Sequence, residues 1–337
     1  MYFYTANLQR SNFAILRIMS IFTKLFQRKI SVGSREYEQH IEEEIKFYKN
    51  IYKYSLVQPV PKTWQCAEDH LTRKIQEATG YTSAEYIVNK IKGRKKINFY
   101  SIGAGAGGVE IETLYPLFKK HKINCHFVLS DINKDVLEKA KFTGEQRGMD
   151  ITIKVVDSNK FTLAENKYDL IFAHASLHHL VNLDTVTQEI NTGLKKNGYF
   201  STVDICSRNG YLLWDETLQM VNALWAALPP KFRISHTAHA EPHYMETFPN
   251  SDLAKKSFEC IQSQEVVPAL RRNLVEEEFV PVFAFMRRFL DTQFGPNFDL
   301  TKELDMSIIN YIIQLDDYYI KSGILKPETF FGVYRKK

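Results

Sequence analysis

The sequence has few cysteines, no repeats and no low-complexity tracts. Its four cysteines are scattered along 337 residues without a C-x-x-C pair or the spacing of a zinc knuckle. This pattern excludes a disulfide framework and indicates a reducing, cytoplasmic compartment. Hydrophobic residues make up 44% of the chain and charged residues 25%, which is typical of a globular protein with a sizeable core.

Acidic residues are absent from the first 35 positions, which carry six basic ones. This basic amphipathic arm, residues 1–35, accounts for the net charge of +5, so the body of the protein is close to neutral and no nucleic-acid partner is expected. Apolar residues recur at helical spacing over 11–30, in a run too short to span a bilayer. Weak contact with a membrane surface and a transit peptide are two interpretations. The preferred one is a packing helix, or upstream sequence before a true start at Met19.

The rest of the chain divides into three parts. Residues 36–93 are expected to form a helical N-terminal subdomain, because charged and amphipathic helical patterns follow one another there. Residues 94–206 alternate between strand and helix patterns and form the predicted ligand-binding core. Residues 207–337 contain helical patterns around two strand candidates, 279–285 and 329–335. We expect this part to form a helical lid whose C-terminal strands complete the sheet.

Alternation of apolar runs with helical segments predicts the architecture of the core. Five runs are predicted as strands: 97–102, 125–130, 151–156, 168–173 and 199–205. Helices are predicted between them, for example over 133–148 and 183–198. Strict alternation indicates an α/β fold with a doubly wound, mostly parallel, seven-stranded Rossmann-like sheet. Ligands of such sheets bind at the carboxyl ends of the strands, and the candidate site is sought there.

A glycine-rich turn follows the first predicted strand. Gly103, Gly105 and Gly108 satisfy the dinucleotide pattern G-x-G-x-x-G, in which glycines let a pyrophosphate approach the backbone. Gly103, Gly105 and Gly107 equally satisfy G-x-G-x-G, which suits a cofactor without phosphate. Asp131 ends the second strand, where a carboxylate accepts both ribose hydroxyls of an adenosine moiety. NAD and S-adenosylmethionine both carry that ribose, so these residues do not choose between them.

The end of the third strand favours S-adenosylmethionine. Asp157 and Ser158 are placed beside the expected adenine, where a carboxylate accepts the exocyclic amine proton and a backbone N–H donates to a ring nitrogen. The same dipeptide is also common in helix caps and turns. A nicotinamide-dependent oxidoreductase is the enzymatic alternative, although the sequence shows no supporting hydride-transfer pattern.

Five motifs, SIGAGAGG, LSDI, VVDSN, KYDLIFAHASLHHL and LKKNGYF, then give a specific resemblance. In this order and spacing they resemble the class I, Rossmann-type S-adenosylmethionine-dependent methyltransferases over residues 97–205. Residues 214–233, 255–272 and 316–337 extend the resemblance to a bacterial group linked to glycan and secondary-metabolite biosynthesis. The resemblance implies cofactor contacts from Ser101, Gly103, Ala104, Gly105, Gly107, Glu110, Asp131, Ile132, Asp157, Ser158 and His174. It also implies methyl transfer to oxygen or nitrogen of a small-molecule, glycan or metabolite acceptor.

Two departures from the family pattern motivate an alternative. Ser101 stands where the family usually has an acidic residue, and Glu110 is the candidate to take over part of its role. After the fifth strand, residues 204–210 lack the acidic-aromatic-glycine-proline segment of the bacterial group. The alternative function is therefore a methyltransferase-fold binding or assembly module without catalysis.

Three histidines follow the fourth strand and are candidates for a general base. An oxygen or protonated nitrogen acceptor needs such a base, and imidazole titrates in the right range. His174, His178 and His179 are the candidates for this base. The alternative is that they cap or pack the following helix, with His174 lining the cofactor. His178 and His179 are not both expected to reach a pocket, because they are neighbours at one helix start.

Aromatic and histidine side chains after the fifth strand are candidates for the acceptor pocket. Tyr211 and Trp214 are expected to form an aromatic wall, although packing of the lid explains them equally well. His239 belongs to a group with His236 and His243, whose spacing matches no zinc motif. No metal is expected, and His239 is assigned to acceptor contact.

Overall fold

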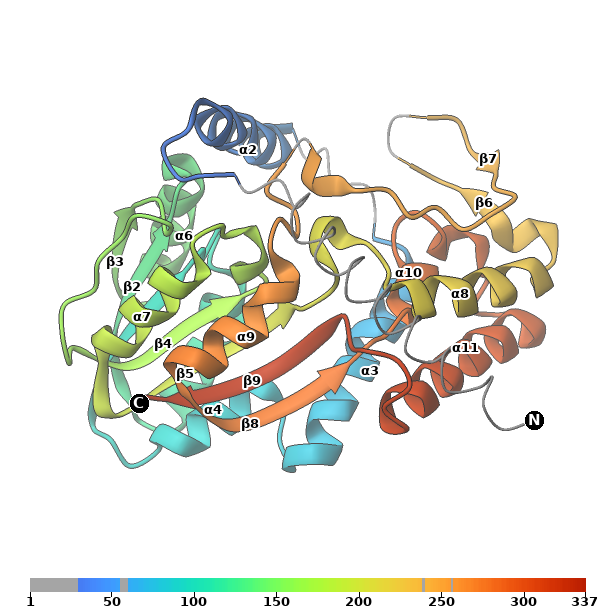
Figure 1. Ribbon diagram of the computed structural model, residues 1–337. Helices are drawn as coiled ribbons and strands as arrows, with labels where there is room; N and C mark the ends of the chain where they lie inside the picture. The colour runs from blue at the N-terminus through green and yellow to red at the C-terminus, as the bar shows by residue number, and fades with distance from the viewer. Residues whose placement is uncertain (1–29, 55–59, 238–239, 256) are drawn as a thin grey trace, which may run out of the picture.

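The computed structural model describes residues 30–54, 60–237, 240–255 and 257–337, and a seven-stranded sheet runs through it (Figure 1). The strands are β1 (Lys96–Ile102), β2 (Asn124–Asp131), β3 (Asp150–Val155), β4 (Tyr168–His174), β5 (Leu194–Ile205), β8 (Val275–Val282) and β9 (Thr329–Arg335). Their order is β3-β2-β1-β4-β5-β9-β8, with parallel pairing up to β5 and antiparallel pairing of β9 with both of its neighbours. The expected doubly wound, mostly parallel sheet is confirmed.

Helices cover both faces of this sheet. The helices are α2 (Arg35–Tyr54), α3 (Lys62–Thr79), α4 (Ser83–Ile91), α5 (Tyr115–Lys120), α6 (Lys134–Gln146), α7 (Leu183–Gly193), α8 (Asp215–Ala227), α9 (Ser263–Asn273), α10 (Met286–Leu290) and α11 (Glu303–Lys321). Successive side chains of a strand point to opposite faces, so each strand supplies two cores. Phe99 and Phe127 pack in one core with residues of α4, α5 and α6, whereas Tyr100 and Val128 pack in the other with α7 and α9.

Two predicted boundaries are wrong because tertiary contacts override local preference. The helix expected over 183–198 ends at Gly193, and β5 begins at Leu194, which pairs with Tyr168 at the start of β4. The strand expected over 279–285 runs instead from Val275 to Val282. Phe283 then takes a left-handed backbone with a φ of 55°, which ends the strand.

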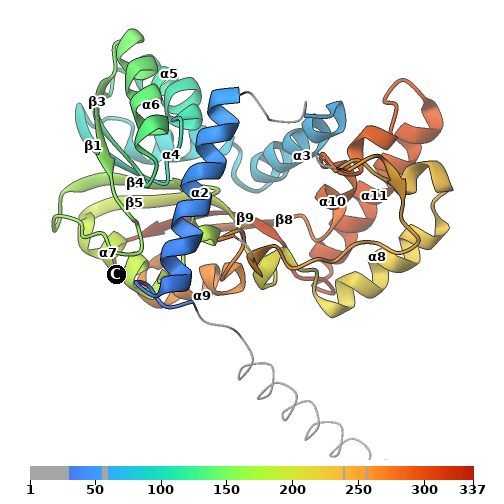
Figure 2. The same cartoon turned by 90° about the horizontal axis from the view of Figure 1, so that it is seen from above.

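The helices of residues 36–93 pack in different places. Helix α2 contacts α6 and lies across the sheet, whereas α3 packs against α10 and β8 (Figure 2). Helices α8, α10 and α11 gather at the end of the molecule remote from β2 and β3, next to the short strands β6 (Ile234–Ser235) and β7 (His243–Tyr244) (Figure 1). The edge formed by the carboxyl ends of the parallel strands is therefore flanked by α2 and by the C-terminal helices.

Two expectations fall on residues that the structure leaves out. Most of the basic arm, residues 1–29, and the acceptor-contact candidate His239 lie outside the described residues. Among the residues that are described, no helix is both long and apolar enough to cross a membrane.

Candidate active site at the carboxyl edge of the sheet

Three glycines of the turn after β1 adopt backbone conformations that favour glycine. Gly103, Gly105 and Gly107 have φ angles of 62°, 53° and 70°, which side-chain-bearing residues rarely adopt. A Cβ on Gly103 would lie 2.6 Å from the Cβ of Ser176, and one on Gly107 would also be crowded. Gly108 has open space around it and no positive φ. The backbone thus depends on G-x-G-x-G rather than on the third glycine of the dinucleotide pattern.

Asp131 ties the end of β2 to this turn. Its Oδ2 accepts the backbone N–H of Gly105 at 3.0 Å, and its Oδ1 accepts that of Asn133 at 2.8 Å. Burial raises the pKa of the Asp131 carboxyl above its ordinary value, although these N–H groups oppose the effect. A carboxylate has about four lone-pair sites, so Asp131 retains acceptor capacity for hydroxyl groups.

Asp157, which follows β3, is held by a residue from α2. The Tyr37 hydroxyl donates to Asp157 Oδ2 at 2.7 Å, while the backbone N–H of Asn159 donates to Oδ1 at 2.9 Å. Tyr37 is fully buried, and Asn159 Nδ2 donates in turn to its hydroxyl oxygen at 3.0 Å. The Lys160 ammonium lies 3.4 Å from Oδ2 as well. Both oxygens of the carboxylate assigned to the adenine edge therefore already have protein partners.

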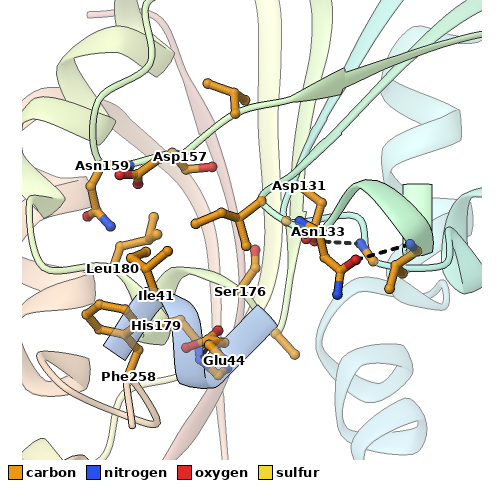
Figure 3. A pocket seen from close by; sticks show the side chains of 17 residues that line it. Ile41, Glu44, Asp131, Asn133, Asp157, Asn159, Ser176, His179, Leu180 and Phe258 are labelled. Atoms are coloured by element: carbon orange, nitrogen blue, oxygen red, sulfur yellow. Dashed lines mark hydrogen bonds and ion pairs between the residues drawn. The ribbon is translucent and has the colours of Figure 1, made fainter. Parts of the chain in front are cut away.

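A cavity of about 240 Å³ brings these loops together (Figure 3). The residues predicted for the site that line it are Gly103, Gly105, Asp131, Ile132, Asp157, Ser158 and His179. Ile41 and Glu44 of α2 line it from the opposite side, and Phe258 from the segment before α9 (Figure 3). The cavity thus lies between the strand ends and α2.

Other predicted cofactor residues lie behind the cavity wall. Ser101 and Glu110 are both buried, and the Ser101 hydroxyl donates to Glu110 Oε1 at 2.5 Å. Burial raises the pKa of the Glu110 carboxyl. Glu110 begins a π-helical turn, Glu110–Leu114, that follows the glycines. Neither these two residues nor Ala104 and Gly107 line the cavity.

His178 faces the protein interior rather than the cavity. Its Nδ1 lies 2.6 Å from Asp204 Oδ1, and its Nε2 lies 3.6 Å from Glu259 Oε1. Asp204, at the end of β5, also accepts the backbone N–H groups of Ser176 and Leu177. Burial would raise the pKa of the Asp204 carboxyl, but His178 and the backbone N–H groups of Leu177 and Ile205 hold it below its ordinary value.

His179 lines the cavity and lies between two carboxylates. Its Nδ1 is 3.3 Å from Glu44 Oε1 of α2, and its Nε2 is 3.6 Å from Glu259 Oε2. Burial lowers the pKa of His179, yet Glu44 and Glu259 outweigh it and raise the pKa to about 9. His179 is therefore a cation at neutral pH and binds α2 to the core.

His174 differs from the other two histidines. It is the last residue of β4, and its side chain is exposed at the carboxyl edge of the sheet. Its pKa lies below the ordinary value, because surrounding protein removes part of its hydration and Arg287 opposes a positive charge; Asp204 acts in the other direction. His174 thus presents a neutral imidazole at neutral pH, although it does not line the cavity described above.

The predicted aromatic wall also lies away from that cavity. The Arg288 guanidinium carbon is 3.5 Å from the Tyr211 ring centroid, and burial raises the pKa of Tyr211 to about 12. The Lys326 ammonium lies 4.0 Å from the Trp214 ring centroid. Both aromatic side chains pack against cations of the C-terminal region.

One cluster of the described residues has ligand atoms spaced for a metal ion. Potential ligand atoms of His178, Glu259 and Cys260 lie within 4.8 Å of one another. The same atoms already take part in the His178–Glu259 ion pair and in a 3.4 Å contact between the Cys260 thiol and Glu259. The expectation that no metal is needed stays a prediction.

Among the residues of this site that sequence reasoning missed are four titratable ones: Tyr37, Glu44, Asp204 and Glu259. Asp204 carried a usable signal, because it ends a strand at the ligand edge as Asp131 does. The helical spacing of Tyr37, Ile41 and Glu44 indicates one face of a helix, but not what that face contacts.

Comparisons with known proteins give one family. Residues 94–273 match a family model described as a methyltransferase domain. No curated protein matches the chain in sequence. One solved structure with a similar fold is a geranyl diphosphate C-methyltransferase from Streptomyces coelicolor. It is 11% identical in sequence with a TM-score of 0.47, and the match covers 91% of this chain and 100% of that one. An S-adenosylmethionine-dependent methyltransferase from Mesorhizobium loti has 13% identity, a TM-score of 0.41, and coverage of 75% and 97%.

Proposed function

Since the chain belongs to the methyltransferase domain family, we propose that it transfers a methyl group from S-adenosylmethionine to oxygen or nitrogen of a small-molecule, glycan or metabolite acceptor. The observation that carries this proposal is the cavity in which the glycine turn, Asp131 and Asp157 converge. The link to glycan and secondary-metabolite biosynthesis stays a prediction from the sequence resemblance.

The residues lining the cavity fit this cofactor. Gly103 and Gly105 line the cavity and carry no side chains, so the methionine portion has room beside their backbone. Asp131 has acceptor capacity for the ribose hydroxyls, and Asp157 for the adenine amine. When bound, S-adenosylmethionine supplies a methyl group activated by a positively charged sulfur.

The acceptor supplies the nucleophile and releases a proton. Its oxygen or nitrogen forms the new bond to the methyl carbon as the carbon–sulfur bond breaks, and the bonding electrons pass to sulfur. Alignment of the two reactants contributes roughly 7–11 kcal/mol to lowering such a barrier. His174 is the proposed base for the proton, because it is exposed at the strand edge and its lowered pKa keeps it neutral. His179 is cationic and His178 is hydrogen-bonded to Asp204, so both are suited to holding neighbouring segments in position rather than to removing a proton.

Calorimetric titration with S-adenosylmethionine, S-adenosylhomocysteine and NAD tests the cofactor. We expect both sulfur compounds to bind in the micromolar range, NAD not to bind, and Asp131→Asn to weaken binding by about tenfold or more. Asp150→Asn is the matched control, because Asp150 lies at the opposite, amino end of β3. Binding of NAD alone would support the oxidoreductase, and binding of none would contradict the cofactor assignment.

A turnover assay distinguishes the proposed methyltransferase from the alternative, a binding or assembly module without catalytic activity. Purified protein with methyl-labelled S-adenosylmethionine is screened against small acceptors that carry hydroxyl or amine groups. With a productive acceptor, His174→Asn should lower kcat by roughly 10²–10⁴-fold and leave cofactor affinity unchanged. Cofactor binding without transfer to any acceptor would favour the binding or assembly module.

A further inference from the structure

The turn after β8 brings an arginine to the edge that carries His174. Strands β5 and β8 both pair antiparallel with β9, so they run in the same direction and end at the same edge of the sheet. Asp316 of α11 accepts the backbone N–H groups of residues 284, 285 and 286 at 2.9, 2.7 and 2.8 Å. This buried carboxylate fixes the turn and thereby the position of the next residue, Arg287.

The Arg287 guanidinium stacks on an aromatic ring. Its carbon lies 4.6 Å from the centroid of the Trp64 ring, at the start of α3. That end of α3 is anchored to α10, because the Thr63 hydroxyl donates to the Leu290 carbonyl oxygen at 3.0 Å. Stacking uses one face of the guanidinium and leaves its N–H edge free for an acceptor. The Arg287 side chain is only half-buried, so a solute can reach it.

Apart from the Trp64 ring, Arg287 has no hydrogen-bond or ion-pair partner within the described part of the chain. Its Nε is buried and has no hydrogen-bond acceptor there, and none of its nitrogens forms an ion pair with a described carboxylate. The carboxylates whose pKa it influences are engaged elsewhere. Glu328 accepts two hydrogen bonds from Arg288 at 2.6 and 2.9 Å, and Asp291 accepts backbone N–H groups.

The third carboxylate whose pKa Arg287 influences, that of Glu259, also has other partners. Glu259 is paired with both His178 and His179. His174 ends β4 and Arg287 follows the end of β8, so both residues stand at the carboxyl edge of the sheet. The lowering effect of Arg287 on the pKa of His174 agrees with this placement. Arg287 is therefore a preorganised cation, without a protein counter-ion among the described residues, at the sheet edge that carries His174.

We propose that Arg287 binds an anionic group, a carboxylate or a phosphate, of the methyl acceptor and so orients the acceptor's nucleophilic atom toward His174. The N–H fork of a guanidinium matches both groups in bidentate geometry, and a rigid, stacked arginine loses little conformational freedom when it binds them. This inference rests on the proposed function, because it specifies the acceptor of that same site.

The test uses protein saturated with S-adenosylhomocysteine and three variants. Inorganic phosphate and acetate are titrated at an ionic strength held constant with potassium chloride, and binding is followed by calorimetry and by the intrinsic tryptophan fluorescence, to which Trp64 contributes. Arg287→Gln removes the charge and Arg287→Lys retains it without the fork. Arg233→Gln is the matched control, because Arg233 also has a buried Nε without a hydrogen-bond partner among the described residues and stacks on Tyr244. It lies by the β6–β7 pair, to which Tyr244 belongs, and not at the turn after β8 (Figure 1).

We expect the wild type to bind at least one of the two anions in the millimolar range, and the comparison of phosphate with acetate identifies the preferred group. Arg287→Gln should weaken this binding by about tenfold or more, Arg287→Lys should retain part of it, and Arg233→Gln should leave it unchanged. Absence of anion binding in a wild type that binds S-adenosylhomocysteine, or equal binding by Arg287→Gln, overturns the inference but not the proposed function. Failure of the wild type to bind S-adenosylhomocysteine contradicts the proposed function itself.

Discussion

Replacing His179 by glutamine should change how the stability of the protein depends on pH. His179 connects two segments distant in sequence, since its ring nitrogens lie 3.3 Å from Glu44 of α2 and 3.6 Å from Glu259. These pairs are largely shielded from solvent, with 18% of the His179 side chain exposed. Screening by salt is therefore weaker than at a surface pair.

The magnitude follows from the pKa of His179, which is about 9 in the folded protein against an ordinary value of 6.5. This interval corresponds to roughly 3 kcal/mol of folding free energy, because each tenfold change in proton affinity is worth about 1.36 kcal/mol. The folded-state pKa is the higher one, so the folded protein holds the proton more tightly. The contribution is fully present below pH 6.5 and is lost as the pH rises through about 9.

Urea unfolding at several pH values between about 6 and 10 measures this contribution. The stability difference between wild type and His179→Gln should shrink by up to roughly 3 kcal/mol across that range. His126→Gln is the control, because His126 pairs with Asp150 at 2.9 Å but that carboxylate is 71% exposed, and such surface pairs contribute little. A difference between wild type and His179→Gln that stays constant with pH would refute the reasoning.

Three further substitutions test the turn, a buried ion pair and the core. Gly103→Ala should lower stability by roughly 1–3 kcal/mol and weaken cofactor binding in a calorimetric titration, since its φ is 62° and the new Cβ would lie 2.6 Å from that of Ser176. Glu328→Gln leaves the buried Arg288 without its counter-ion and should cost roughly 3–5 kcal/mol in urea unfolding, whereas an unchanged midpoint would contradict that role. Trp225→Ala removes a fully buried ring from an aromatic cluster and leaves a cavity, which should lower the free energy of unfolding by roughly 3–5 kcal/mol. An unaltered thermal unfolding midpoint would be the contrary result.

The fold was accessible from the sequence because each strand carries its own signal. The apolar runs that became β1, β2 and β4 are short, and turns or helix starts follow them directly. Their alternation with amphipathic helices restricts the topology to a parallel, doubly wound sheet. The residue at which β8 ends could not be predicted from the local sequence in this way. It depends on Asp316, which lies more than thirty residues later and binds the turn at 284–286.

The same distinction between local and distant information applies to the site. Gly103, Gly105 and Asp131 belong to one strand-turn-helix unit and its neighbour, so a short motif specifies them. Tyr37 reaches Asp157 across 120 residues of sequence. In the sequence it reads as an ordinary apolar position of an amphipathic helix, because helical spacing identifies a buried face without identifying what buries it.

Helix α2 consequently links the N-terminal part of the chain to the cavity through side chains that no local motif identifies. Tyr37 donates to the Asp157 carboxylate at one end of the cavity, and Glu44 pairs with His179 farther along the helix. Asp157 Oδ1 accepts the backbone N–H of Asn159, and Oδ2 accepts the Tyr37 hydroxyl and lies 3.4 Å from the Lys160 ammonium. An adenine amine must therefore either use a remaining lone pair or displace one of these partners, such as Tyr37. In the first case α2 stays closed over the bound cofactor, and in the second, if Tyr37 is displaced, its N-terminal end must move away. Only in the second case does the Asp157 carboxylate, which the sequence assigns to the adenine, couple the position of α2 to occupancy of the cavity.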